Sequence, residues 1–112
     1  MALLICLRKH LRERGVWHTR SEPNLKALCD LVALGTIADA VPLVDENRIF
    51  VTAGIEVIRS GRARTGVIGI LNTCRMSCRD VDAEDLDFKI VPRLNAAGRM
   101  DHALLATRLL LT

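Results

Sequence analysis

Aromatic side chains are almost absent from this sequence of 112 residues, which has two Phe, one Trp and no Tyr. Proteins that bind single-stranded nucleic acid often hold bases on a platform of aromatic rings, and the chain has too few rings to build one. The core must therefore be aliphatic, and a hydrophobic content of 50% allows this. The length corresponds to one domain or a piece of one. The net charge of +3 permits contact with nucleic acid but does not by itself indicate it.

The sequence contains cysteine, but not in the pattern of a disulfide framework. Cys6, Cys29, Cys74 and Cys78 are irregularly spaced, which argues against structural disulfides and favours a reducing cytoplasm. Cys74 and Cys78 could share a helix face, but no second Cys or His pair completes a zinc site. No apolar run is long enough to span a bilayer, and the first run lacks the basic residues that precede a signal sequence. We expect a cytoplasmic protein without a membrane segment.

Helical spacing of apolar residues dominates the sequence. With Gly and Pro at suitable ends, it predicts helices over residues 1–14, 24–40, 47–60, 65–75, from 82 or 83 onward with an interruption or kink at Pro92, and 102–111 with a cap at Asp101. We therefore expect an all-α fold, a compact bundle of five or six helices. Because the chain starts and ends abruptly on apolar segments, we also expect it to be a piece of a longer protein.

One carboxylate in the predicted 24–40 helix needs a partner. Asp39 lies within the apolar run 37–41, so we expect its side chain to be buried or nearly so. Burial of a charge is costly, and a carboxylate at the C-terminal end of a helix also opposes the helix dipole. The partner could be a basic side chain, a helix cap or a divalent cation, and local chemistry does not choose among them. Gly35 predicts close approach of a backbone or ligand to the same helix.

A second candidate site lies between residues 93 and 99. Arg93 and Arg99 can each hold a phosphate through paired N–H donors, and Asn95 lies between them. The small residues 96–98 would let a ligand, or another helix, come close. The alternative is a helix end that is capped by arginine and packed on a neighbouring helix.

Several other polar clusters are better explained as solvated surface than as sites. The basic groups are phosphate-contact candidates and the acidic group is a metal candidate, but charges at helix ends account for most of them. The basic groups are Arg8–Arg14 and the turn with Arg59, Arg62 and Arg64, and the acidic group is Asp82, Glu84, Asp85 and Asp87. The histidines His10, His18 and His102 have no partners at metal or catalytic spacing.

Two stretches together resemble a known family. Residues 30–43, with Leu-Gly-Thr-Ile-Ala-Asp at their centre, resemble the fourth metal motif of the DHH phosphoesterase superfamily. Residues 91–101, with Pro-Arg-Leu-Asn-Ala-Ala-Gly-Arg-Met, resemble a segment of the RecJ branch, the bacterial single-stranded-DNA-specific exonucleases. The spacing between them, the opening Leu-Arg-x-x-Leu-Arg-Glu helix and Glu-Pro-Asn-Leu at 22–25 are similar to RecJ as well. The resemblance therefore spans essentially the whole chain.

The resemblance implies a 5′→3′ single-stranded-DNA exonuclease of DNA repair and recombination that uses Mn²⁺ or Mg²⁺. It implies that Asp39 is a metal ligand and that Asn95, Arg99 and Arg93 hold the DNA backbone or the scissile phosphate. Residues 1–112 would form a single helical unit, from the C-terminal part of the DHH catalytic domain and the following connecting region. The family's Asp-x-Asp, further aspartate and Asp-His-His motifs are missing from this chain, so no catalytic set is complete in it.

Such ions take about six ligands, so we expect the chain alone to bind metal weakly and to lack nuclease activity. Helices cut from a larger core should expose apolar surface of the predicted 24–40 helix, so we expect a homodimer or higher oligomer. Two other interpretations stay open. One is a non-catalytic helical interaction module in which Asp39 pairs with Arg99. The other is a different DHH phosphoesterase, such as an oligonucleotide or pyrophosphate hydrolase.

Overall fold

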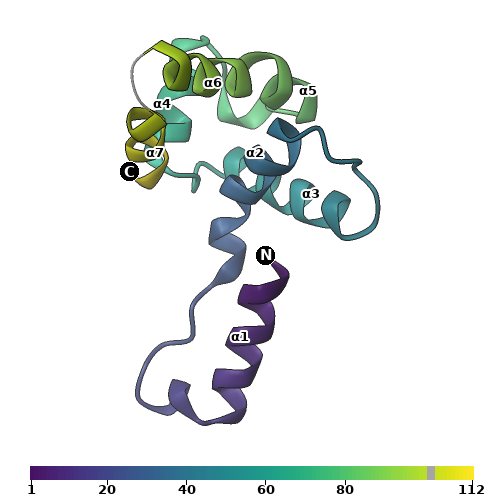
Figure 1. The fold of residues 1–112 in the computed structure, drawn as a ribbon, viewed down its shortest axis with the longest axis vertical. Coiled ribbons are helices and arrows are strands. Elements are labelled where there is room, and N and C mark those ends of the chain that lie inside the picture. Colours follow the sequence, from purple (N-terminus) through teal and green to yellow (C-terminus); the bar gives the residue numbers. More distant parts are fainter. Residues whose placement is uncertain (101–102) are drawn as a thin grey trace.

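A computed structural model describes residues 1–100 and 103–112, and within these ranges all regular structure is helical, which confirms the expected all-α fold (Figure 1). The elements are α1 (Ala2–Glu13), a 3₁₀ turn (Val16–His18), a 3₁₀ turn (Leu25–Leu28) that leads into α2 (Cys29–Ala38), α3 (Asp45–Arg59), α4 (Thr65–Thr73), a 3₁₀ turn (Cys78–Asp80), α5 (Ala83–Asp85), a π-helical segment (Leu86–Ile90), α6 (Val91–Met100) and α7 (Ala103–Leu111). The predicted cap at Asp101 and helix start at His102 lie outside the described residues.

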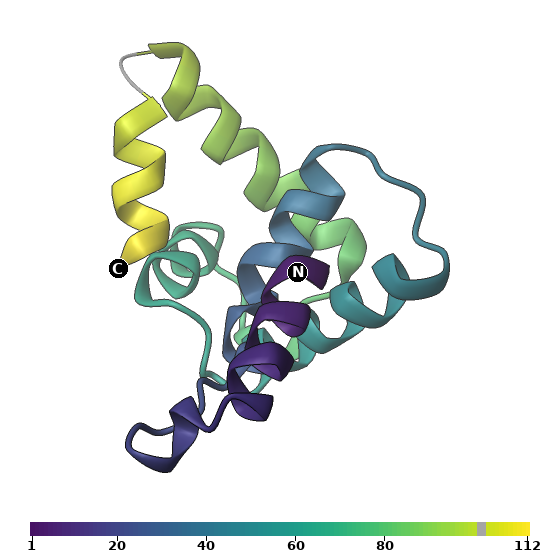
Figure 2. The ribbon, with the colours of Figure 1, turned by 60° about the horizontal axis from the view of Figure 1, so that its bottom comes forward.

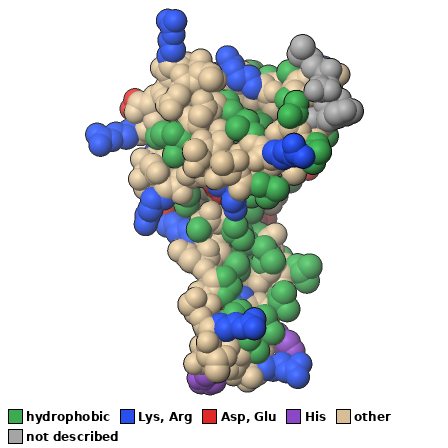
Figure 3. Space-filling model, turned by 90° about the vertical axis from the view of Figure 1, so that its left-hand side faces the viewer, with side chains coloured by type: hydrophobic (Ala, Val, Ile, Leu, Met, Phe, Trp, Pro, Cys, Tyr) green, Lys and Arg blue, Asp and Glu red, His purple; other side chains and the backbone are tan. Residues whose placement is uncertain are grey.

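Helices α2–α7 form the compact part of the molecule, while α1 projects from it (Figures 1 and 2). The chain extends 44 Å along its longest axis but 30 and 24 Å along the others. No residue of α1 is buried, and its predicted apolar face is open, with Leu3 80% and Leu7 49% exposed. The connector that follows holds α1 through Trp17, whose Nε1 donates to the Arg8 carbonyl at 3.3 Å. Figure 3 shows hydrophobic side chains gathered along this projecting part.

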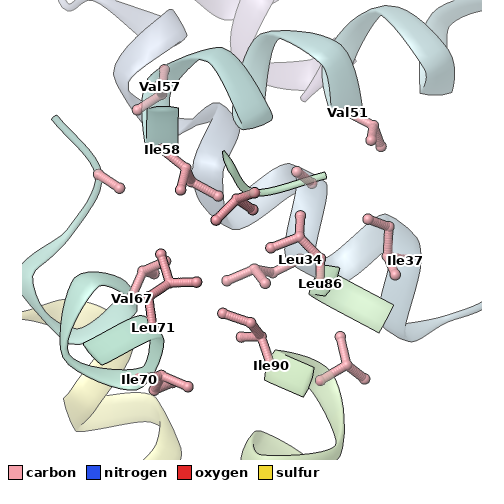
Figure 4. Close-up of a cluster of buried hydrophobic side chains, with 14 residues drawn as sticks. Leu34, Ile37, Val51, Val57, Ile58, Val67, Ile70, Leu71, Leu86 and Ile90 are labelled. Carbon is pink, nitrogen blue, oxygen red and sulfur yellow. The ribbon is translucent and has the colours of Figure 1, made fainter. Parts of the chain in front are cut away.

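The core lies where α2, α3 and α4 meet the continuous helix that α5, the π-helical segment and α6 form (Figure 4). Its buried side chains are aliphatic, as expected, and include Leu34, Ile37, Val51, Val57, Ile58, Val67, Ile70, Leu71, Leu86 and Ile90. The spacing of apolar residues predicts that Val67, Ile70, Leu71 and Cys74 form the inner face of α4; the first three are buried and Cys74 is half-buried. For α3 the spacing predicts a buried stripe of Ile49, Phe50, Ala53, Val57 and Ile58; Val57 and Ile58 are buried, but Ile49 is 66% exposed. The residues of α3 that pack inward are Val51, Gly54, Val57 and Ile58, at the spacing of one helix face.

Gly54 permits the close approach of α2 and α3. A Cβ built at position 54 would lie 2.5 Å from the Ala33 Cβ and closer still to the Cys29 carbonyl oxygen. Close approach at Gly35 was expected, but that glycine is exposed, and among the described residues no atom beyond its chain neighbours and its own helix backbone lies within 4 Å of a Cβ built on it. The glycine that the packing requires therefore lies on the partner helix α3.

Pro92 does not end the helix in which it lies. The residues before it form the π-helical segment, in which the Val91 N–H donates to the Leu86 carbonyl five residues back. Proline lacks an N–H and clashes with the carbonyl four residues earlier in an ordinary α-helix. The wider π-helical turn relieves this conflict, so the expected interruption takes the form of a change in helix type.

Candidate functional site

Asp39 occupies the C-cap of α2, and its side chain is exposed rather than buried. Its backbone N–H donates to the Gly35 carbonyl at 3.1 Å. The next residue, Ala40, has a φ of +51°, so the chain turns away from the helix axis there. Residues 40–46 are exposed, including the apolar side chains of Val41, Leu43 and Val44. The expected burial of Asp39 is wrong because the core covers Ile37 only, and residues 38–46, which follow it, are exposed.

The buried carboxylate of α2 is Asp30, at its other end, with no exposed surface. Its oxygens accept hydrogen bonds from the backbone N–H of Leu31 at 2.8 Å and of Arg64 at 3.0 Å. The Arg64 Nε lies 3.9 Å away, which makes an ion pair but not a hydrogen bond. Asp30 thus ties the first turn of α2 to the start of α4. The predicted helix over residues 24–40 put Asp30 in a helix interior, so no sequence signal pointed to this role; the structure places it in the first turn of α2, where the helix dipole favours a carboxylate.

Asp39 has neither a basic partner nor a cluster of further ligands among the described residues. In residues 1–100 and 103–112, no ion pair joins it to Arg99, and no three His, Cys, Asp or Glu side chains gather as a metal site. The chain therefore offers one accessible carboxylate at this position. That donor suits a hard cation such as Mg²⁺ or Mn²⁺ as a single ligand, and it does not form a complete site.

The three predicted phosphate-binding residues lie on α6, and all are exposed. The Arg93 Nη1 donates to the Lys89 carbonyl at 2.6 Å, so its side chain folds back on the preceding turn. Asn95 and Arg99 lie four residues apart, on a side of α6 that faces away from Leu94 and Ala97, which point inward. The structure therefore places Asn95 and Arg99 on one open face and directs Arg93 elsewhere.

The other charged clusters mostly have structural contacts. Asp82 and Asp85 form a capping box, each accepting a backbone N–H of the other, at 2.8 and 3.2 Å. The hydrogen bond from Lys89 at 2.6 Å lowers the pKa of Asp85. In the basic turn, the Arg59 Nε donates to the Val81 carbonyl at 2.8 Å. The contacts of Asp82 and Asp85 support the interpretation of the acidic cluster as surface structure, and the contact of Arg59 gives one residue of the basic turn a structural role.

The basic residues of α1 and the cysteines also have local explanations. Glu22 pairs with Arg12 and Arg8, and the hydrogen bond from Arg12 lowers the pKa of the Glu22 carboxyl. All four cysteines are free thiols, and burial raises the pKa of Cys29. No helix in the described part of the chain is both long and apolar enough to pass through a bilayer.

Comparison with known proteins gives one consistent result. The chain is 46% identical over 111 residues to the single-stranded-DNA-specific exonuclease RecJ of Dickeya dadantii, and 44% identical over 111 residues to that of Escherichia coli. Each match covers 97% of this chain but only 19% of the relative. The RecJ of Thermus thermophilus is 39% identical over 83 residues, covering 74% of this chain and 12% of the relative. No protein-family model matches the chain.

Proposed function

Because the chain belongs to the RecJ family and matches one segment of its members, we propose that it forms part of a metal-dependent single-stranded-DNA exonuclease. The intact enzyme would be a cytoplasmic DHH-type hydrolase that degrades DNA from the 5′ end during repair and recombination. Residues 1–112 would be the helical end of its catalytic domain and the connecting region that follows. The observation that carries this proposal is the 46% identity over 97% of the chain, which spans both candidate sites.

Asp39 would be the chain's contribution to a Mn²⁺ or Mg²⁺ site. Its exposed carboxylate at the end of α2 is accessible to an ion whose other ligands come from outside residues 1–112. Such an ion supplies an activated water and neutralises charge on a phosphate. The open loop beyond Asp39, with apolar Val41 and Val44, offers a surface on which the rest of a catalytic domain can pack.

Asn95 and Arg99 would hold the DNA backbone. A guanidinium donates two parallel hydrogen bonds to a phosphate and stabilises the negative charge that develops on it during hydrolysis. Arg93 would join them only after releasing the Lys89 carbonyl. An exonuclease assay tests the proposal, with 5′-labelled single-stranded DNA and Mn²⁺ or Mg²⁺. We expect the chain alone to be inactive and a chimera, in which it replaces the matching 111 residues of Escherichia coli RecJ, to be active.

Two results of this assay would contradict the proposal. One is a chimera that is folded, as judged by circular dichroism, and that still releases no nucleotides. The other is nucleotide release by the chain alone, at a rate well above that of its Asp39→Asn variant.

We also propose that the isolated chain self-associates through the apolar face of α1. Leu3, Leu4 and Leu7 are 80%, 41% and 49% exposed, and exposed apolar faces of this kind favour association. Light scattering is expected to give the mass of a dimer or higher oligomer, and Leu3→Ser with Leu7→Ser should give a monomer. Ile49→Ser, which alters an equally open side chain on α3, is the control and should leave the mass unchanged. A monomer at high concentration before any substitution would refute self-association.

A further inference from the structure

Phe88 is the one aromatic side chain of the described residues that is mostly exposed, with 74% of its surface open. Trp17 and Phe50 are half-buried. The backbone beneath Phe88 is well anchored, because Leu86 and Ile90 on the same π-helical segment have no exposed surface. The ring therefore stands in solvent on a fixed support. Burying a ring is strongly favourable, so its exposure needs an explanation.

The ring continues the open face on which Asn95 and Arg99 lie. Pro92, Asn95 and Arg99 follow one another at steps of three and four residues along α6, and Phe88 lies about one turn before Pro92 on the π-helical segment, so the four share one side of the continuous helix, away from Leu94 and Ala97. At about 1.5 Å per residue, Phe88 and Arg99 are roughly 16 Å apart along the axis. This span matches a few nucleotides of an extended strand.

The side chains between the Phe88 ring and the Arg99 guanidinium are small, so the helix surface between them is open. Pro92 and Ala96 are exposed, and among the described residues no atom beyond the chain neighbours and the helix's own backbone lies within 4 Å of a Cβ built on Gly98. A strand could therefore approach the helix surface between Phe88 and Arg99 without displacing a long side chain.

The acidic residues near Phe88 are directed away from this face. Glu84 and Asp87 line a pocket against the end of α2 and the following loop, and Asp85 is paired with Lys89 at 2.6 Å. The face itself carries Asn95 and Arg99 and no carboxylate among its described residues. Its polarity suits a phosphate backbone.

We propose that Phe88 stacks on a base of the single-stranded DNA whose backbone is held at Asn95 and Arg99. The inference rests on the proposed function, and it adds a contact to the bases where that function requires only contacts to phosphates. A single ring can serve this purpose because every base has a flat face, so stacking does not depend on sequence. The competing occupant is an apolar protein surface, which would cover Phe88 but would not sense the presence of bases.

The test compares two oligonucleotides with the same 5′-phosphorylated backbone, one of oligothymidylate and one fully abasic. Binding to the 112-residue chain is measured by fluorescence anisotropy at low salt. Stacking on one aromatic ring contributes about 1–3 kcal/mol per base, so Phe88→Ala should weaken binding of oligothymidylate by about five- to 150-fold. Binding of the abasic strand should not change. Ile49→Ala, which removes another open apolar side chain, should change neither.

Arg99→Ala separates this inference from the function on which it rests. It should weaken binding of both strands equally, because it removes a phosphate contact. If Arg99→Ala has that effect but Phe88→Ala weakens neither strand, or weakens both equally, the stacking role is overturned and the backbone site stands. If the unsubstituted chain binds neither strand, or Arg99→Ala has no effect, the backbone site at Arg99 is overturned and the stacking role with it.

Discussion

Replacement of Gly54 by alanine is expected to lower the free energy of unfolding by about 3 kcal/mol. The added Cβ would collide with the Cys29 carbonyl oxygen and lie 2.5 Å from the Ala33 Cβ. A helix backbone has no rotamer through which it can move aside, so α2 and α3 would have to separate. Their separation opens the core at Leu34 and Ile58. Thermal unfolding followed by circular dichroism should show a fall of about 10–20 °C in Tm.

Gly35→Ala is the matched control, because Gly35 also lies inside a helix but has open space around it. Alanine is favoured over glycine in a helix interior, so this variant should gain about 0.5–1 kcal/mol. The packing described for α2 and α3 is contradicted if both variants lose stability equally, or if Gly54→Ala unfolds at the temperature of the unsubstituted chain.

Local signals in the sequence predicted most of the secondary structure. Gly15 and Gly61 were expected to end helices, and both adopt positive φ, at +72° and +71°, just beyond α1 and α3. The inner face of α4 also follows from its own spacing, with Val67, Ile70 and Leu71 buried. These features depend on residues a few positions apart, which a sequence displays directly.

Burial of the two carboxylates of α2 could not be predicted in the same way. Asp30 and Asp39 both adjoin apolar residues, but the start of α4 reaches one and no described element reaches the other. The contact between Asp30 and Arg64 joins residues 34 positions apart, and no local pattern encodes it. The same limit explains Ile49, whose exposure depends on which side of α3 meets α2. The exposure of Phe88 was equally hidden, because it depends on which side of the π-helical segment packs into the core.

Asp39→Asn is expected to abolish most of the nuclease activity of the Escherichia coli RecJ chimera. Loss of one charged ligand removes several kcal/mol of transition-state stabilisation, which corresponds to at least about a 100-fold fall in kcat. Stability should not fall, because the Asp39 side chain is exposed. The uncharged amide also removes an unfavourable interaction with the C-terminal end of the α2 dipole.

Asp30→Asn is the control at the opposite end of the same helix. Asp30 is fully buried, and its oxygens accept two backbone hydrogen bonds. Removal of its charge should lower the free energy of unfolding by about 3 kcal/mol, because an amide cannot accept both bonds and Arg64 loses its ion-pair partner. The activity of the molecules that remain folded should change little. The two substitutions are chemically identical, but Asp39→Asn should lose activity and keep its stability, whereas Asp30→Asn should lose stability and keep its activity.

The most direct measurement is the rate of nucleotide release from 5′-labelled single-stranded DNA, in Mn²⁺ and per folded molecule, by these two chimeras. We predict that Asp39→Asn loses at least about 100-fold in rate with no fall in Tm, and that Asp30→Asn keeps its rate while its Tm falls. If the Asp39→Asn chimera cleaves DNA at the rate of the unsubstituted chimera, Asp39 is not a metal ligand and the account fails.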